Sequence, residues 1–153
     1  MPWEEFIDYL SGKYPQEQFK VPFTAWPGIF RNIEERFIIK KWSQEVYRNW
    51  LGNVKKEVPV KTILYPAIEN EIYKLDINTN FWLVIVYGYS DRSRQYVFDC
   101  HVYPMQELIR WAPGDFFIVD KRYNWLTWFK VNKDKNEVSI SKSGDGKTPF
   151  DAQ

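Results

Sequence analysis

The sequence predicts an α+β fold in which an antiparallel sheet of about five strands packs against N-terminal helices, with one short helix inserted between strands. Three observations predict it. Apolar residues have mainly helical spacing over residues 1–77 and mainly strand spacing over residues 78–142. No linker, repeat or low-complexity block divides the chain. At 153 residues the chain is about as long as one domain. We therefore expect a single domain over 1–153 that ends in a flexible tail over 143–153.

Two helices are expected near the N-terminus. The first follows Pro2, a residue that suits the first helical position, and ends near Gly12. Trp26 and Pro27 open the second helix. Its apolar residues recur at i, i+1, i+4 and i+8, so they share one face, and Glu34 lies largely on the opposite, solvated face.

Two further helices complete the first half. Ser43 caps a third helix, which ends at Gly52 or Asn53. Residues 54–61 form a basic connector, and a fourth helix is expected from Tyr65 to Leu75.

The second half begins with the run 81–89, which is apolar almost throughout. Such a run predicts a central strand covered on both faces. A hairpin loop over 90–93 leads to a returning strand over 94–100, and a short helix starts at Pro104. Three more strands are expected at 115–120, 124–131 and 136–141.

The composition excludes several classes of protein. Lys and Arg number 21 against 20 Asp and Glu, so the chain lacks the basic excess that a nucleic-acid partner requires. A single cysteine, Cys100, excludes an intramolecular disulfide, and with a single histidine it makes a metal site or other cofactor unexpected. The acidic N-terminus does not resemble a signal peptide, and the longest apolar run is far shorter than the ~20 residues that span a bilayer. We expect a cytoplasmic protein without membrane contact.

Aromatic residues are the compositional outlier, because eight Trp, ten Tyr and eleven Phe make up 19% of the chain. Core packing should account for most of them, since aromatic side chains bury large areas. Those left on the surface are suited to anchoring a protein interface.

Asp99 and His101 form one candidate site. The two residues are two apart on a predicted strand, so they share a face, and a carboxylate can orient an imidazole for base catalysis. The alternative is a partly solvated pair at a strand end without a chemical role. Cys100 lies between them and faces the opposite side, so it forms no dyad with His101 and should be a buried, inert thiol.

The turn and strand that follow residue 119 form the second candidate site, for binding. Its residues are Asp120, Lys121, Arg122, Tyr123, Trp125 and Trp128. The two tryptophans are three apart, so they face opposite sides of a strand, and we expect one in the core and one turned outward. Tyr123 shares a face with Trp125 if the strand is regular. The alternative is a plain hairpin with a solvated tip.

A resemblance to a known family rests on these same segments. The chain FWLVIVYGYSDRSRQYVFDCHVYPMQELIRWAPGDFFIVDKRYNWL resembles a family of small uncharacterised bacterial proteins that share a motif similar to "YYIVDKKYxWL". The motif corresponds here to residues 117–123 with Trp125 and Leu126, and the helix start at Trp26 is also similar. In related sequences the strand after this motif continues into a segment that contains histidine. The corresponding residues here, 127–134, contain none. The resemblance implies an immunity-type or accessory protein of a bacterial toxin system, with no histidine-based role carried over.

The sequence therefore favours a non-enzymatic protein-binding module, such as an immunity-type protein with a toxin-like partner. Charged residues would steer the encounter and aromatic residues would supply affinity. The alternative is a small-molecule-binding domain or unrecognised enzyme with an aromatic-lined cleft that contains Asp99, His101 and Asp120. A third alternative is a homodimer whose aromatic residues pair.

Overall fold

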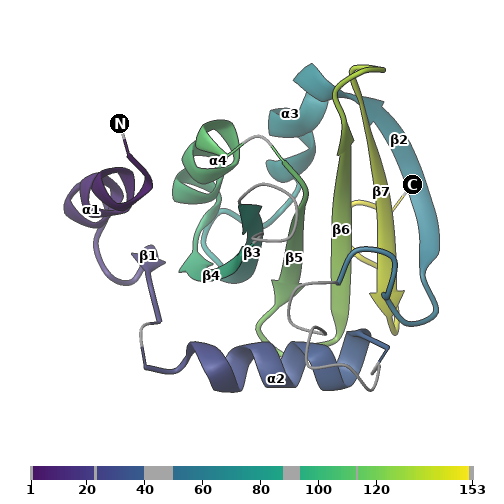
Figure 1. Ribbon diagram of the computed structural model, residues 1–153, viewed down its shortest axis with the longest axis horizontal. Coiled ribbons are helices and arrows are strands. Elements are labelled where there is room, and N and C mark those ends of the chain that lie inside the picture. Colours follow the sequence, from purple (N-terminus) through teal and green to yellow (C-terminus); the bar gives the residue numbers. More distant parts are fainter. Residues whose placement is uncertain (1, 23, 40–49, 88–93, 113, 152–153) are drawn as a thin grey trace.

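The computed structural model describes residues 2–22, 24–39, 50–87, 94–112 and 114–151, and these form one antiparallel sheet with helices on both faces (Figure 1). The strands are β1 (Phe19–Lys20), β2 (Val58–Leu64), β3 (Phe81–Tyr87), β4 (Arg94–Cys100), β5 (Phe116–Asp120), β6 (Trp125–Asn132) and β7 (Glu137–Gly144). The helices are α1 (Trp3–Lys13), α2 (Trp26–Phe37), α3 (Ile68–Ile72) and α4 (Val102–Trp111). The strand order is β1-β4-β3-β5-β6-β7-β2.

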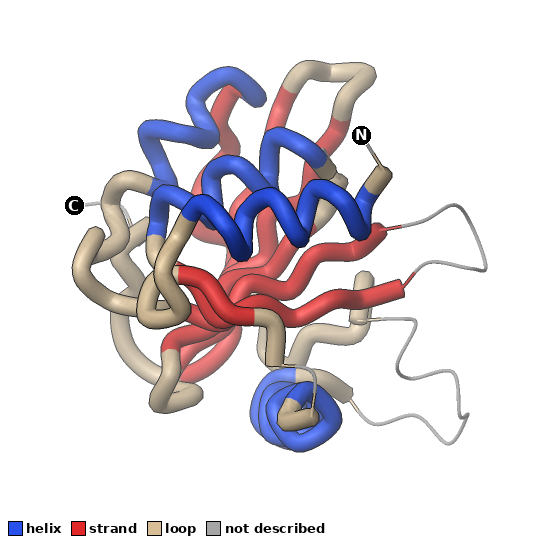
Figure 2. The backbone as a smooth tube through the Cα atoms, turned by 90° about the vertical axis from the view of Figure 1, so that its left-hand side faces the viewer, coloured by secondary structure: helices blue, strands red, loops and turns tan. Residues whose placement is uncertain are grey.

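The helices divide between the two faces of the sheet. Helices α1, α3 and α4 cover one face, and α2, seen end-on in Figure 2, lies against the other. Two separate cores result. The three-helix core includes Leu10, Phe19, Ile72, Leu83, Phe98, Met105, Leu108, Phe116, Phe129 and Phe150. The α2-side core consists of Ile29, Phe30, Ile33, Phe37, Ile38, Trp50, Val54, Val84, Val97, Phe117, Val119, Leu126 and Trp128.

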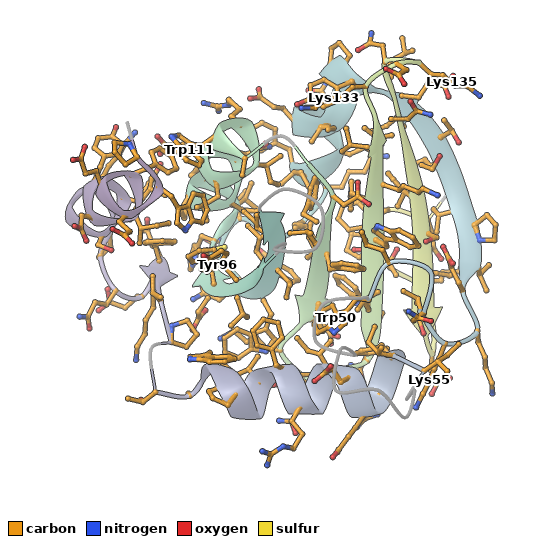
Figure 3. All side chains as sticks on the ribbon, viewed as in Figure 1. Trp50, Lys55, Tyr96, Trp111, Lys133 and Lys135 are labelled. Carbon is orange, nitrogen blue, oxygen red and sulfur yellow. The ribbon has the colours of Figure 1, made fainter. Side chains whose placement is uncertain are left out.

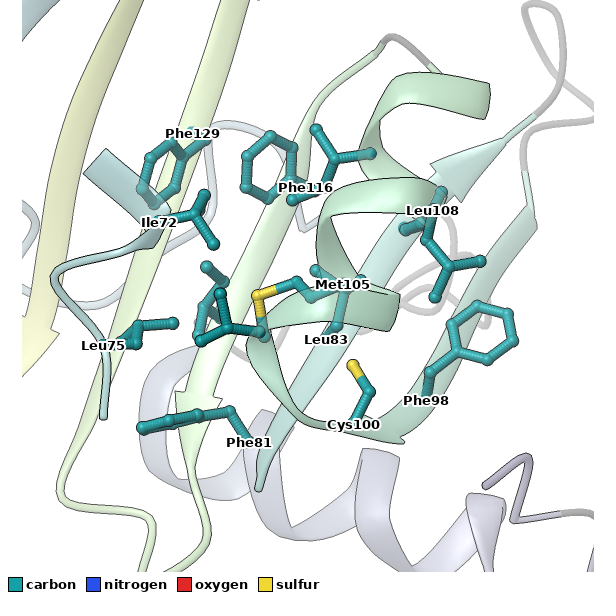
Figure 4. Close-up of a cluster of buried hydrophobic side chains, with 14 of the residues drawn as sticks. Ile72, Leu75, Phe81, Leu83, Phe98, Cys100, Met105, Leu108, Phe116 and Phe129 are labelled. Carbon is teal, nitrogen blue, oxygen red and sulfur yellow. The ribbon is translucent and has the colours of Figure 1, made fainter. Parts of the chain in front are cut away.

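Strand β3 explains why the sequence is apolar almost throughout residues 81–87. It lies between β4 and β5, and successive side chains point to opposite faces, so those of residues 81–86 enter the two cores in turn. Leu83 packs in the three-helix core (Figure 4), whereas Val84 packs in the α2-side core. The prediction of a central strand covered on both faces is confirmed. The expected hairpin loop 90–93 lies outside the described residues.

The α+β class is confirmed, but five strands were too few, because the described residues contain seven. Both missed strands lie in the half that was expected to be helical. Strand β1 is a two-residue element in a proline-rich loop, and β2 occupies much of the expected connector 54–61. Both are edge strands, and a register shift between Pro59 and Lys61 interrupts the alternation of β2. Strand β1 is too short to show a pattern, and the exposed residues of β2 include the apolar Val58 and Leu64, so its sequence does not alternate as a half-buried strand does.

Helix α2 confirms the predicted apolar face, with one correction. Glu34 was placed on the solvated face, but it is buried. The indole of Trp50, which lies between α2 and the sheet (Figure 3), donates a hydrogen bond to Glu34 Oε2 at 3.3 Å. Burying the indole requires an acceptor, and Glu34 supplies it. Most of the helix expected after Ser43 lies outside the described residues.

The last two of the five expected helices are present, but their bounds differ from the expectation. The helix expected from Tyr65 to Leu75 is a 3-10 turn over Tyr65–Ala67 followed by α3, although its inward residues Ile68, Ile72 and Leu75 are buried as predicted. Helix α4 starts at Val102, two residues before Pro104, since proline is tolerated in a first turn.

The tail was wrongly expected to be flexible from residue 143 onward. Strand β7 continues to Gly144, and Phe150 is fully buried in the three-helix core. Asp151 accepts a hydrogen bond from Lys142 Nζ at 2.6 Å. Burial alone would raise the pKa of Asp151, but the bonds from Lys142 and Thr148 outweigh it and lower that pKa. The burial of Phe150 and the Lys142–Asp151 ion pair thus anchor the described tail.

Candidate functional site

The predicted turn after β5 is organised by Asp120. Its Oδ1 atom accepts hydrogen bonds from the backbone N–H groups of Asn124 at 2.7 Å and Trp125 at 2.9 Å. Tyr123 has a φ of +56°, a left-handed conformation that reverses the chain. Asp120 therefore closes the turn through its own carboxylate, as Asp does in many turns.

Lys121 and Asp99, which were predicted as members of two separate sites, meet at one end of the sheet. Lys121 Nζ lies 2.8 Å from Asp99 Oδ2 and 3.6 Å from the centre of the Trp82 ring. Asn80 donates a hydrogen bond to Asp99 Oδ1 at 2.7 Å. The β3–β4 register brings them together, because Trp82 is directly opposite Asp99. We call Asn80, Trp82, Asp99 and Lys121 the strand-end cluster.

His101 takes no part in the hydrogen bonds of Asp99. It stands immediately before α4, and its backbone N–H donates to Gln18 O at 2.8 Å. Its Nδ1 atom is buried and has no hydrogen-bond partner among the described residues. Hydrogen bonds from the Asn78 backbone and the Thr79 hydroxyl lower the pKa of Asp76, and the charge of His101 adds to that effect. His101 therefore acts electrostatically on Asp76, whereas the carboxylate of Asp99 forms its ion pair with Lys121.

The two tryptophans of β6 lie on opposite faces, as their spacing predicted. Trp125 packs in the three-helix core and Trp128 in the α2-side core. However, only 8% of Trp125 and 5% of Trp128 is exposed, so the expected outward-facing tryptophan is wrong. The sheet is covered on both sides at this point, and Trp128 Nε1 donates to Asp115 Oδ2 at 3.1 Å. Burial raises the pKa of Asp115, although this bond and one from the Val131 backbone oppose the effect.

Tyr123 also departs from the expected arrangement. It packs against the α2-side core, whereas Trp125 belongs to the three-helix core, so the two do not share a face. The left-handed φ of Tyr123 interrupts the alternation on which the expectation depended. Arg122 is exposed at the tip of the turn.

The strand-end cluster gives a stability prediction. Lys121→Ala is expected to lower the free energy of unfolding by about 1 kcal/mol, because it removes a cation–π contact and a partly exposed ion pair. Arg122→Ala, its exposed neighbour, is the control and should change that free energy by less than about 0.5 kcal/mol. Urea unfolding monitored by tryptophan fluorescence measures both. Equal effects of the two variants would contradict a special role for Lys121.

A second group of residues, which the sequence reasoning missed, lies on the surface of α3 and α4. Tyr73 and Tyr103 are 45% and 48% exposed, and their rings meet edge to face with centroids 6.1 Å apart. On the same two helices, Arg110 of α4 forms an ion pair with Glu69 of α3. We call these four residues the α3–α4 surface.

A buried glutamine fixes the spacing of that surface. Gln106, on α4, donates from Nε2 to the backbone oxygen of Glu69 at 2.9 Å, and Tyr73 N donates to the same oxygen at 3.1 Å. Tyr103 lies off the apolar face of α4, and Tyr73, the residue after α3, does not continue the apolar series Ile68, Ile72 and Leu75. This position was the sequence signal that could have found them. An aromatic residue on the polar side of an amphipathic helix is a candidate for an interface.

The described residues provide few groups for chemistry. No set of three or more His, Cys, Asp or Glu side chains among them is placed to hold a metal ion. Burial strongly raises the pKa of the Cys100 thiol, so the thiolate that nucleophilic chemistry requires is suppressed. None of the helices in the described ranges is long and apolar enough to cross a bilayer.

The fold and its surfaces define an aromatic-rich α+β protein built on one antiparallel sheet. No protein-family model, curated protein or solved structure matches the chain. The resemblance to an uncharacterised bacterial family therefore stays a prediction.

Proposed function

We infer that the protein is a non-enzymatic binding module for another protein, as an immunity-type protein would be, and that it binds through the α3–α4 surface. The observation that carries this proposal is the pair of half-exposed tyrosines in contact across two neighbouring helices. Tyrosine and arginine are enriched at protein interfaces, because they combine a large contact area with hydrogen-bonding groups. Tyr73, Tyr103 and Arg110 provide that combination.

The rigidity of the α3–α4 surface also supports the proposal. Each tyrosine loses little conformational freedom on binding, since its ring already packs against the other. The Gln106 bond fixes the helices that carry them. A partner that presents an apolar spot with polar groups around it would fit this surface.

The alternative, a small-molecule or enzymatic cleft that uses Asp99, His101 and Asp120, has less support. Asp99 is engaged by Lys121 and Asn80, and Asp120 is engaged by backbone N–H groups. A carboxylate that is held by such partners is not poised to accept a proton from a substrate.

The test is affinity capture from an extract of the source organism, with the full chain as bait. The protein captured by the wild type should be lost with the Tyr73→Ala/Tyr103→Ala double variant. Tyr9→Ala is the matched control, because Tyr9 is equally exposed on α1, and it should retain the partner. With the purified partner, the double variant should raise Kd by about tenfold or more, in line with the loss of interface hot spots.

Two outcomes would count against this proposal. Capture that is unaffected by the double variant would place the binding surface elsewhere. A wild-type bait that retains no protein in stoichiometric amount would remove the support for a binding module.

A further inference from the structure

Two phenol rings are in contact on the α3–α4 surface. Of the tyrosines that the structure describes, three are about half exposed, namely Tyr9, Tyr73 and Tyr103. The ring of Tyr9 stacks on Phe6, with centroids 6.1 Å apart, and phenylalanine has no hydroxyl group. The contact between Tyr73 and Tyr103 is the one ring contact that joins two described tyrosines. This pair is therefore placed for a reaction between two phenols that solvent reagents can reach.

The geometry of the pair suits the coupling of two phenoxyl radicals. The ring centroids are 6.1 Å apart and the ring planes are inclined by 65°, so the edge of one ring lies against the face of the other. Radical coupling of phenols joins the ring carbons next to the carbons that bear the hydroxyl groups, and these carbons lie at the ring edges. Because exposed side chains change rotamer within nanoseconds, side-chain rotation can bring the two carbons together.

The two helices hold the rings at this spacing. Gln106 of α4 donates a hydrogen bond to the backbone oxygen of Glu69 at 2.9 Å, and the N–H of Tyr73 donates to the same oxygen. Only 1% of Gln106 is exposed, so its bond is shielded from water. Holding two reacting groups side by side makes their reaction effectively unimolecular, which favours it over coupling between separate chains.

We propose that Tyr73 and Tyr103 form an oxidative modification site, at which a one-electron oxidant couples the two rings into dityrosine. Each phenol gives one electron to the oxidant and its hydroxyl proton to water. The two phenoxyl radicals then form one carbon–carbon bond between their rings. The hydrogens on the two bonded carbons move to the oxygens and restore both hydroxyl groups, so the chain has lost two hydrogens in total.

The crosslink would join residues that are thirty positions apart in sequence and lie on neighbouring helices. Such a bond restricts the unfolded chain as a disulfide does, and it ties α3, a helix of five residues, covalently to α4. It would also fix both rings in one arrangement and so change the α3–α4 surface. Its effect on a partner rests on the proposed function, whereas the crosslink itself forms in the purified chain alone.

The test oxidises the purified full chain, at low protein concentration, with light-generated ruthenium(III) tris-bipyridine and with persulfate as the final electron acceptor. We expect dityrosine fluorescence in chains that keep the mass of one copy, 18.5 kDa, on denaturing electrophoresis. After protease digestion, mass spectrometry should find the peptides of Tyr73 and Tyr103 joined, with two hydrogens fewer than their sum. A chain oxidised in urea should lack this link, because the fold is what brings the rings into contact.

Three variants identify the coupled residues. Tyr73→Phe and Tyr103→Phe each keep a ring that can pack but remove one hydroxyl, so each should abolish the link. Tyr9→Phe is the matched control, because Tyr9 is equally exposed and its ring contacts Phe6, and this variant should form the link as the wild type does.

Several results would overturn the proposal. The wild type could form dityrosine only between chains or not at all, or it could form the link equally well in urea. Linked peptides that persist in Tyr73→Phe or Tyr103→Phe, or that disappear in Tyr9→Phe, would assign the coupling to other tyrosines. No partner is present in this test, so its result is independent of the affinity capture.

Discussion

Replacing Phe150 with alanine is expected to lower the free energy of unfolding by about 3–5 kcal/mol, the range for removing a buried phenylalanine. The ring is fully buried and meets two aromatic rings at right angles, with centroids 5.1 Å from Phe129 and 6.3 Å from Trp125. Urea unfolding followed by fluorescence and by far-ultraviolet circular dichroism measures the loss.

Two further variants separate the cavity from other effects of altering the tail. Phe150→Leu retains much of the volume and should cost clearly less than the alanine variant. Pro149→Ala changes the exposed residue next to it and should have little effect. If Phe150→Ala unfolds at the same urea concentration as the wild type, the tail does not complete the three-helix core.

Gly144→Ala is expected to lower the free energy of unfolding by about 3 kcal/mol, through backbone strain and steric overlap together. Gly144 has a φ of +106°, which residues with a side chain rarely adopt. A Cβ at this position would overlap the backbone oxygen of Asn124 and lie 2.9 Å from a ring carbon of Phe37. Thermal and urea unfolding measure the loss.

Gly146→Ala is a matched control for the steric part. Gly146 also has a positive φ, +84°, but no atom lies within 4 Å of a Cβ built there. This variant should lose only the strain, about 1 kcal/mol. Equal losses for the two variants would mean that the close approach of β7 to Asn124 has no energetic role.

The core strands could be predicted from the sequence because the order of their apolar residues along the chain indicates which side chains are buried. Residues 81–87 are apolar in succession, and strands β5 and β6 alternate between the two cores. Strand β2 could not be predicted in this way, because its exposed residues include the apolar Val58 and Leu64 and a register shift after Pro59 breaks its alternation. The tail was missed for a related reason. Phe150 is a single apolar residue among polar ones, and its burial depends on a contact with β6 that no local pattern encodes.

Two members of the strand-end cluster could be predicted from the sequence, but their arrangement could not. Asp99 and Lys121 were both singled out, but their contact depends on the pairing of β3 with β4 and β5. Because Tyr123 has a left-handed φ, its side chain lies on the opposite face of the sheet from Trp125 and not on the same face, as expected. Tyr73 and Tyr103 are thirty residues apart in sequence, and only the packing of α3 beside α4 makes them one surface.

The strand order has a consequence for the order of folding. In the described sheet the only neighbour of β2 is β7, and the paired residues Val58 and Lys142 are separated by more than half of the chain. During synthesis β2 therefore emerges from the ribosome well before the strand that it pairs with. Until β7 follows, both sides of β2 lack a partner, and an unpaired apolar strand is prone to misassembly. We expect refolding to be limited by this long-range pairing, as sheets with distant contacts fold slowly.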